Sequence, residues 1–460
     1  MTLFNKIRNR WNNKCGYKEV LVLALPLIIS TGSFSLQLFV DRVFLTWVSQ
    51  ETVAASMPAG MLNFTIMSLF IGTAIYVSTF IAQYFGSKQL KNIGPIMWQG
   101  IYIAVIAGII HLLIIPFAED IFNFIGHGDL VRQKETIYFQ ILCIGALPLV
   151  ASASMSGFFS GRGKTLTVMW VNIASTGVNV ILDYILIFGK LGFPALGIKG
   201  AGIATVISSV IKLVIYIVLI YNKSNDKLYN VIKGWKINKE LFLRLNKFGV
   251  PSGIQFCIEM LGFTIFILLV GRLGVVELAA TTIAFNVNSL AFMPMIGFGI
   301  AISIMVGQNI GRKNIELAEY SVYSGFHLTG IYMLTLSLLY LFVPDIFLNP
   351  YALEAEYESF ESIKNLSRVL LKFVAFYCVF DTLNIIFASA IKGAGDTKYV
   401  MYIISIASLC LLVLPSYIVI NVLKMDIYAS WYIITFYVIV LGFIFLMRFL
   451  NGQWKKMSVI

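Results

Sequence analysis

The stretch LALPLIISTGSFSLQLFVD (residues 23–41) decides the fold class, because it is long and apolar and yet contains a proline and an acid. A helix needs about 20 mostly apolar residues to cross a bilayer. Eleven further apolar runs follow, and none alternates polar and apolar residues as a membrane β-strand would. We therefore expect an all-α polytopic membrane protein of twelve transmembrane helices, near residues 18–47, 53–84, 95–117, 134–158, 165–189, 200–221, 243–272, 278–308, 318–343, 366–391, 398–422 and 427–450.

The composition of the 460 residues supports this prediction. Hydrophobic residues make up 59% of the chain and charged residues 12%, against roughly 45–50% and 25% in soluble domains. So few charges cannot cover a water-soluble surface, which excludes a soluble enzyme. The formal charge of +12 then reflects basic loops held against anionic membrane lipids, and we expect no nucleic acid partner. The five cysteines and three histidines show no metal-ligand spacing, so we expect no resident metal or cofactor.

The Lys and Arg residues gather in alternate loops, foremost in residues 223–247, which contain seven of them. Because basic loops stay on the cytoplasmic side, both termini are predicted to be cytoplasmic. The polar stretch 222–242 becomes a cytoplasmic linker between an N-lobe (1–221, spans one to six) and a C-lobe (243–460, spans seven to twelve).

The two halves of the chain carry matching motifs. Three pairs share the offset that carries Pro26 onto Pro251, and a fourth pair has a slightly larger offset. The pairs are LALPLIIS with KFGVPSGIQ, WVSQETVAAS with RLGVVELAAT, AQYFGSKQ with GQNIGRKN, and SGRGKTLTVMW with KGAGDTKYVMY. Six spans per half give both halves the same orientation, so a pseudo-twofold axis along the membrane normal is expected, as in some transporters. The cleft between two such bundles would be the substrate path.

Acids inside the spans are the candidate functional residues, since a carboxylate at membrane depth costs about 2.5–3.5 kcal/mol on insertion scales. Four remain after loop acids are removed: Asp41, Asp183, Glu259 and Asp381. Each has an oxygen-bearing side chain three or four residues away on the same helix face, and these neighbours are Gln37, Asn179, Gln255, Tyr377 and Asn384. Hard cations such as Na⁺ prefer oxygen ligands, so the pattern predicts Na⁺ or proton sites.

Simpler interpretations compete at two of the four positions. Asp41 precedes Arg42, so the two could form an interfacial ion pair, and Asp183 could bond only neighbouring backbone. Glu259 and Asp381 have no basic residue within one helical turn, which favours a functional role for them.

The chain resembles the multidrug and toxic compound extrusion (MATE) family in an ordered set of features. They are the two six-span repeats, the acid in LFVDRVFLTWVS, Glu259 after the Pro251 motif, Asp381 before SAIKGAGDT, and the paired AQYFGSK and GQNIGRK loops. The resemblance covers essentially the whole chain. It implies a cation-coupled antiporter, driven by Na⁺ or H⁺, that expels cationic or amphiphilic organic compounds from a prokaryotic plasma membrane, with a monomer expected.

The resemblance also implies two coupling sites. Asp41, Asn179, Asp183 and Thr205 match the N-lobe cluster of DinF-type members, and Glu259, Tyr377 and Asp381 match the C-lobe acids of NorM-type members. Either lobe could therefore hold the coupling ion, with Gln37, Gln255 and Asn384 in support. The alternative is a lipid-linked saccharide flippase of the same superfamily, which would favour a basic central cavity, whereas the charges within these spans are mostly acidic.

Overall fold

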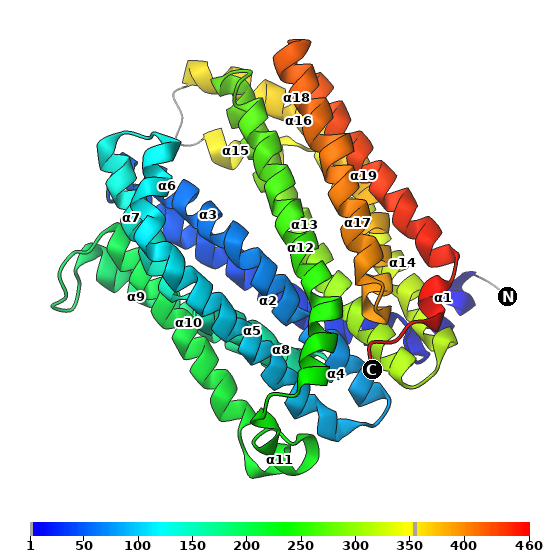
Figure 1. Ribbon diagram of the computed structural model, residues 1–460. Coiled ribbons are helices and arrows are strands. Elements are labelled where there is room, and N and C mark those ends of the chain that lie inside the picture. The colour runs from blue at the N-terminus through cyan, green and yellow to red at the C-terminus, as the bar shows by residue number, and fades with distance from the viewer. Residues whose placement is uncertain (1–2, 353–356) are drawn as a thin grey trace. The chain divides into compact units, whose positions relative to one another are not determined.

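A computed structural model describes residues 3–352 and 357–460 (Figure 1). Within these ranges every regular element is helical. The α-helices are α1 (Leu3–Asn12), α2 (Tyr17–Thr46), α3 (Gln50–Ile75), α4 (Val77–Gly86), α5 (Ile93–Ile114), α6 (Ala118–Ile125), α7 (Asp129–Ile144), α8 (Ala146–Ser160), α9 (Thr165–Phe188), α10 (Ile198–Ile220), α11 (Lys223–Tyr229), α12 (Lys239–Val270), α13 (Val275–Gly311), α14 (Ile315–Phe342), α15 (Asp345–Ala352), α16 (Tyr357–Ala394), α17 (Thr397–Ala407), α18 (Leu414–Tyr417) and α19 (Ile427–Leu450). Short 3₁₀ or π turns join several of them: η1 (Leu90–Asn92), η2 (Ile115–Phe117), η3 (Lys233–Trp235), η4 (Ser408–Val413), η5 (Ile418–Val422) and η6 (Gln453–Lys456).

Eleven helical segments among the described residues are long and apolar enough to cross a membrane. A twelfth span results when α7 and α8, which bend by 44° at their junction, count as one. Gly145 lies between them, within the single span that the sequence predicts over 134–158. The all-helical membrane fold with its twelve spans is thus confirmed in its coarse form.

The chain folds into two compact units. Unit 1 comprises residues up to Ile28 together with 258–458, and unit 2 comprises 29–257 together with 459–460. The boundaries fall inside α2 and α12, shortly after Pro26 and Pro251, where a proline removes one helical hydrogen bond and eases bending. The predicted lobe boundary in the linker stays a prediction.

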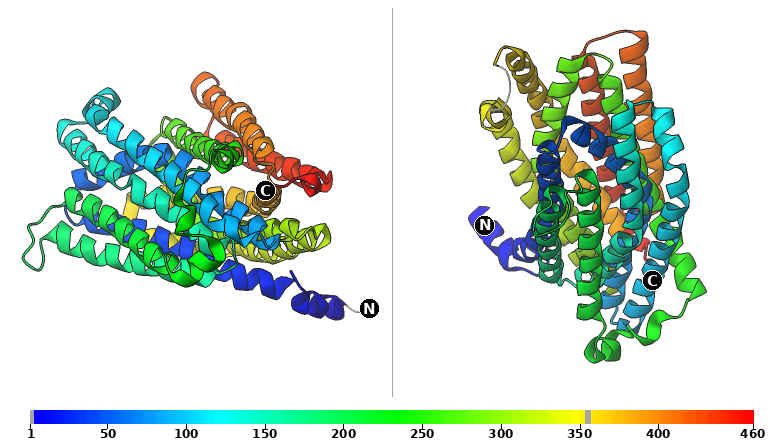
Figure 2. Two further views of the ribbon diagram at one scale, coloured as in Figure 1. Left: turned by 60° about the horizontal axis from the view of Figure 1, so that its bottom comes forward. Right: turned by 90° about the vertical axis from the view of Figure 1, so that its left-hand side faces the viewer.

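Within each unit the long helices run side by side (Figures 1 and 2). In unit 2, α9 packs on α10, α5 on α8 and α3 on α7, and in unit 1, α16 packs on α13, α14 and α19. Membrane helices lack a hydrophobic drive to associate in lipid, so close approach through small residues matters more. The helix pair α9–α10 uses this device at Gly200, where an added Cβ would lie 2.7 Å from the backbone of Leu186.

The internal repeat reappears in the local backbone. Lys88 and Lys313, which are related by the same offset as Pro26 and Pro251, both adopt the left-handed conformation that few non-glycine residues take, with φ of 62° and 58°. Gly163 and Gly395 occupy matching positions in the fourth motif pair, and they likewise have φ of +81° and +120°. The same turn chemistry therefore ends matching helices in both halves.

The segments outside the spans are also folded. In the predicted linker, α11 and η3 lie against α5, where Trp98 Nε1 donates to the Val231 carbonyl at 2.7 Å. At the other end of the chain, Val459 is buried and its backbone N–H donates to Gln83 Oε1 at 2.9 Å, within unit 2.

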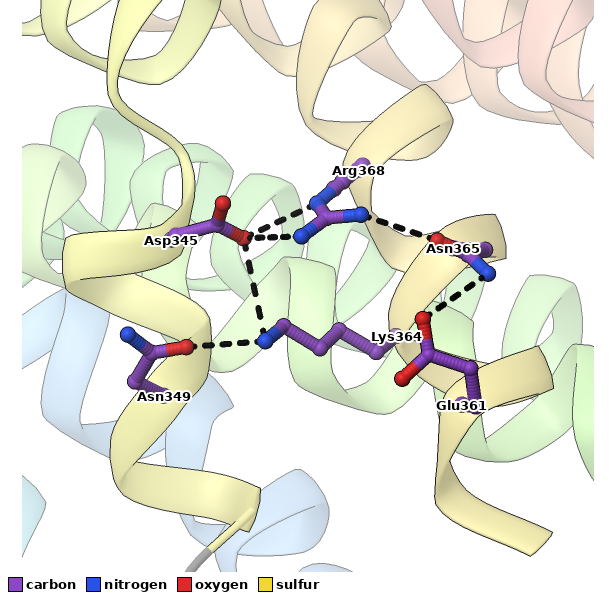
Figure 3. Close-up of polar contacts among 6 residues, drawn as sticks. All are labelled: Asp345, Asn349, Glu361, Lys364, Asn365 and Arg368. Carbon is purple, nitrogen blue, oxygen red and sulfur yellow. Dashed lines mark hydrogen bonds and ion pairs between the residues drawn. The ribbon is translucent and has the colours of Figure 1, made fainter. Parts of the chain in front are cut away.

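A clasp of polar side chains holds α15 to α16 in unit 1 (Figure 3). One oxygen of Asp345, Oδ1, lies 2.8 Å from both Nε and Nη2 of Arg368 and 4.0 Å from Nζ of Lys364. Lys364 also donates to Asn349 Oδ1 at 2.9 Å. These exposed or half-buried contacts fix the short helix α15 together with the buried Leu348 and the packing of Phe347 on Tyr340.

Candidate functional site

The strongest candidate site lies in unit 2, where two carboxyl groups share one amide. Asp41 from α2 is 6% exposed, and Asp183 and Asn179 from α9 are fully buried. With the Asn179 amide turned so that its NH₂ faces the two acids, this group donates to Asp41 Oδ1 and to Asp183 Oδ2, both at 3.1 Å. We call Asp41, Asn179 and Asp183 the paired-acid cluster.

The two acids of this cluster also act on each other electrostatically. Two bare carboxylates that share one amide donor would repel each other. The cluster therefore needs a proton or another cation to be stable.

One oxygen of this cluster, and one on the neighbouring helix α10, lack hydrogen-bond partners within the described part of the chain. Asp183 Oδ1 and Thr205 Oγ1 are buried without a hydrogen-bond partner among the described residues. Thr205 lies on α10, between two points where this helix contacts α9. At one point Gly200 of α10 packs on Leu186 of α9, and at the other the Ser208 carbonyl of α10 accepts a hydrogen bond from Ser175 of α9. This places Thr205 at the level of Asn179. Buried oxygens without donors suit a cation with oxygen ligands.

Arg42 does not form the surface ion pair that the sequence left open. Asp41 is buried, whereas the Arg42 side chain is exposed and makes no ion pair within the described part of the chain. Arg42 acts on Asp41 only through longer-range electrostatics. Gln37 is half-buried one turn earlier on α2, and it has no hydrogen bond to the described acids.

Sequence reasoning missed Tyr138 on α7. This tyrosine is buried and lies close enough to Asp41 and Asp183 to interact electrostatically with both. A tyrosine in an apolar run carried no signal in the sequence, because α7 contains no acid of the cluster and only the packing of α7 brings it there.

The second set of acids lies in unit 1. Asp381 on α16 is 7% exposed and accepts from Asn384 Nδ2 at 3.1 Å, one turn later on the same helix. Glu259 on α12 is half-buried and close enough to interact electrostatically with Asp381. The predicted neighbours Tyr377 and Gln255 are both buried, and Tyr377 lies near Asp381.

A lysine accompanies these acids, which the sequence interpretation does not foresee. Lys392 on α16 interacts electrostatically with Glu259, and we call Glu259, Asp381, Asn384 and Lys392 the acid–lysine cluster. Lys392 follows Asp381 by about three helical turns, so the two share a helix face. That spacing is visible in the sequence, but the charge pattern assigns Lys392 to a cytoplasmic loop. Tyr437 on α19 also lies near Glu259, with its hydroxyl 3.1 Å from Ser408 Oγ.

Neither cluster is built as a fixed metal centre. The described residues include no group of three or more His, Cys, Asp or Glu side chains that could hold a metal ion. An exchangeable cation fits two carboxyls and an amide better than a tightly held transition metal does.

Long apolar helices in two sequence-related halves, each with buried carboxyl groups, are the architecture of a secondary transporter. The comparisons with known proteins agree. The MatE family model matches residues 26–185 and 251–418, which is more than half of the chain. The protein therefore belongs to the MATE family and is a multi-pass membrane transporter, not an enzyme.

Similar proteins extend over the whole chain. A probable multidrug resistance protein NorM from Thermotoga maritima is 25% identical over 96% of this chain and 94% of its own. One from Oceanobacillus iheyensis is 27% identical over 90% of this chain and 92% of its own. A solved outward-facing multidrug resistance MATE transporter matches with a TM-score of 0.87 at 19% identity, covering 98% of both chains. This last likeness establishes the fold alone.

Proposed function

We propose that the protein is a cation-coupled multidrug efflux antiporter, driven by Na⁺, H⁺ or both. It would export amphiphilic or cationic organic compounds from a prokaryotic cell by alternating access. The names of the NorM-type relatives support the substrate class. The paired-acid cluster supports the coupling.

The observation that best supports this proposal is that the Asn179 amide donates to both Asp41 and Asp183. One positive charge in this cluster relieves the repulsion between the two carboxylates, and loss of that charge restores the repulsion. If the ion binds one conformation better than the other, its binding shifts the equilibrium between them. The coupling ion is thus cargo that enters and leaves, consistent with buried oxygens that lack a donor. The acid–lysine cluster would play a secondary role, because Lys392 already supplies a positive charge there.

Dye transport in proteoliposomes tests the proposal. The purified protein is reconstituted with a cationic fluorescent dye, and a Na⁺ gradient or a pH gradient is imposed separately. We expect dye movement against its gradient with at least one of the two ions, and none in empty liposomes or with Asp183→Asn. Dye movement unaffected by either ion gradient would overturn the coupling. Rescue of a strain that lacks its lipid-linked saccharide flippase, without dye transport, would favour that alternative.

Topology is tested independently of transport. Both termini and the linker would be cytoplasmic, with the loop between α9 and α10 outside. Single cysteines at the exposed positions Ile237 and Leu191, which are 72% and 83% exposed, are introduced into a cysteine-free variant. We expect an impermeant thiol reagent applied to whole cells to label position 191 and to spare position 237. The reverse pattern would invert the topology.

A further inference from the structure

We infer that unit 1 holds a binding pocket for the headgroup of an anionic phospholipid, lined by Lys14 and Arg312. This inference is independent of the proposed transport function. The pocket has a volume of about 540 Å³. The polar residues that line it, the headgroup pocket, are Lys14, Glu19, Gln308, Asn309, Arg312 and Asn314.

The location of the pocket fits headgroup depth. It lies where α2 begins at Tyr17, α13 ends at Gly311 and α14 begins at Ile315, and all three helices are membrane spans. The ends of three spans mark the boundary between hydrocarbon and water. Apolar residues also line the pocket, namely Leu23, Met305 and Leu317, so it offers both polar and apolar contacts.

Charge decides the class of ligand. Lys14 and Arg312 are exposed and form no ion pair within the described part of the chain, and Lys18 lines an adjoining pocket with Trp11 and Val22. The one carboxylate that lines the pocket is Glu19, whose Oε2 already accepts the backbone N–H of Cys15 at 2.8 Å. Cations outnumber carboxylates, so the pocket favours an anion, and Lys and Arg at a membrane surface attract anionic lipid.

The pocket is preformed, since buried contacts fix the side chains that line it. Asn309 is 1% exposed, and its Nδ2 donates to the Met305 carbonyl at 2.9 Å and to Cys15 Sγ at 3.2 Å. Arg312 Nη1 is 3.4 Å from Asn309 Oδ1, which directs the guanidinium. Burial raises the pKa of the Cys15 thiol, so this cysteine packs as a neutral group and offers no thiolate chemistry.

The repeat supplies an independent comparison. Gln308, in the last turn of α13, corresponds to Gln83, near the end of α4 in the first half, by the offset that relates Pro251 to Pro26. In unit 2, the side chain of Gln83 receives Val459, a segment of the chain itself. The end of α13 at Gln308 instead borders a cavity of ligand size, so the same motif meets a segment of the chain in one half and lines a cavity in the other.

Lipid titration of the purified protein in detergent tests the inference. The probes are short-chain phosphatidylglycerol, short-chain phosphatidylethanolamine and inorganic phosphate, followed by native mass spectrometry and thermal unfolding. We expect phosphatidylglycerol to bind best and Lys14→Gln/Arg312→Gln to weaken it on the order of twentyfold, since each cation near a lipid surface contributes about fivefold. The control Lys223→Gln/Lys236→Gln removes two exposed charges elsewhere and should leave binding unchanged.

Three outcomes would overturn the inference. Equal binding of both lipids would remove the need for an anionic headgroup. Equal competition by inorganic phosphate would make free phosphate the ligand. An equal loss of phosphatidylglycerol affinity in both double variants would mean that the lipid binds through general surface charge. If Lys14→Gln/Arg312→Gln does not fold, Glu19→Gln decides the matter: it removes the opposing carboxylate and keeps an acceptor for Cys15, so it should tighten phosphatidylglycerol binding about threefold, and unchanged or weaker binding contradicts the pocket.

Discussion

The paired-acid cluster of unit 2 and the acid–lysine cluster of unit 1 arise from the same sequence signature and yet differ in charge. Both begin as a membrane acid with an oxygen-bearing neighbour one turn away. In unit 2, packing adds a second acid, and one amide serves both. In unit 1, packing brings Lys392 close enough to Glu259 for the two to interact electrostatically, so a positive charge is already part of the protein.

This difference teaches where an external cation is needed. Among the described residues, the only charged group that acts electrostatically on Asp41, apart from Asp183, is the exposed Arg42. A buried acid pair without a fixed cation depends on a mobile one. From this comparison we propose that ion sensitivity resides in unit 2 and that the charged cluster of unit 1 serves structural stability, and the following variants test this difference.

The largest effect is expected from Asp41→Asn with Glu259 and Asp381 intact. Removing one carboxyl removes the repulsion that a bound cation relieves, so ion-driven efflux should fall about a hundredfold, equivalent to about 2.7 kcal/mol. The measurement is dye efflux from proteoliposomes under Na⁺ and pH gradients, beside wild type and Glu259→Gln. An unchanged response to Na⁺ and pH in Asp41→Asn would leave the acid–lysine cluster as the coupling site.

Asn179→Ala should have the next largest effect. It removes the donor to both carboxyls and leaves buried acceptors unsatisfied, which costs about 1–3 kcal/mol, so coupled efflux should fall about tenfold. The matched variant is Asn384→Ala, which removes a donor to Asp381 alone and should lower efflux only about threefold. If Asn384→Ala proves the more damaging, the roles of the two clusters are reversed.

A smaller, structural effect is expected for the pair Glu259 and Lys392. Glu259→Gln and Lys392→Gln should each lower thermal stability in detergent, while the double variant should lose less than the sum, with a coupling of about 1 kcal/mol. Unfolding is followed by intrinsic fluorescence as the temperature rises. Strictly additive losses would show that the two charges do not support each other.

Arg42→Gln should change least. The side chain is exposed and unpaired among the described residues, so its removal should alter efflux less than about twofold, within the roughly 0.5 kcal/mol typical of surface substitutions. The readout is the Na⁺ and pH dependence of efflux, as for Asp41→Asn. A loss as large as that of Asp41→Asn would restore the ion-pair interpretation.

Most of the fold could be predicted from hydropathy and repeats, because lipid forces long apolar helices. The first span, expected at 18–47, is α2 at Tyr17–Thr46. Hydropathy could not predict the bend at Gly145, since averaging over a window conceals a local break in hydrogen bonding. Nor could it predict α15, whose position depends on tertiary contacts, namely the polar clasp around Asp345 and the packing of Phe347 on Tyr340.

The site was predictable only within single helices. Asn179 with Asp183, and Asp381 with Asn384, follow from spacing along one helix. The meeting of Asp41 with Asp183, and of Lys392 with Glu259, depends on packing between helices far apart in sequence. Tyr138 is the extreme case, because neither its residue type nor its neighbours distinguished it from ordinary packing.

The burial of Val459 has a practical consequence for anyone who handles the protein. A purification tag or fluorescent protein fused directly after Ile460 would pull on a segment whose backbone N–H is bonded to Gln83 and whose side chain is 1% exposed. Such a fusion would report on a disturbed molecule, and a flexible spacer of about ten glycine and serine residues would separate the attachment from that contact. Assays of the variants above are best made on protein tagged through such a spacer.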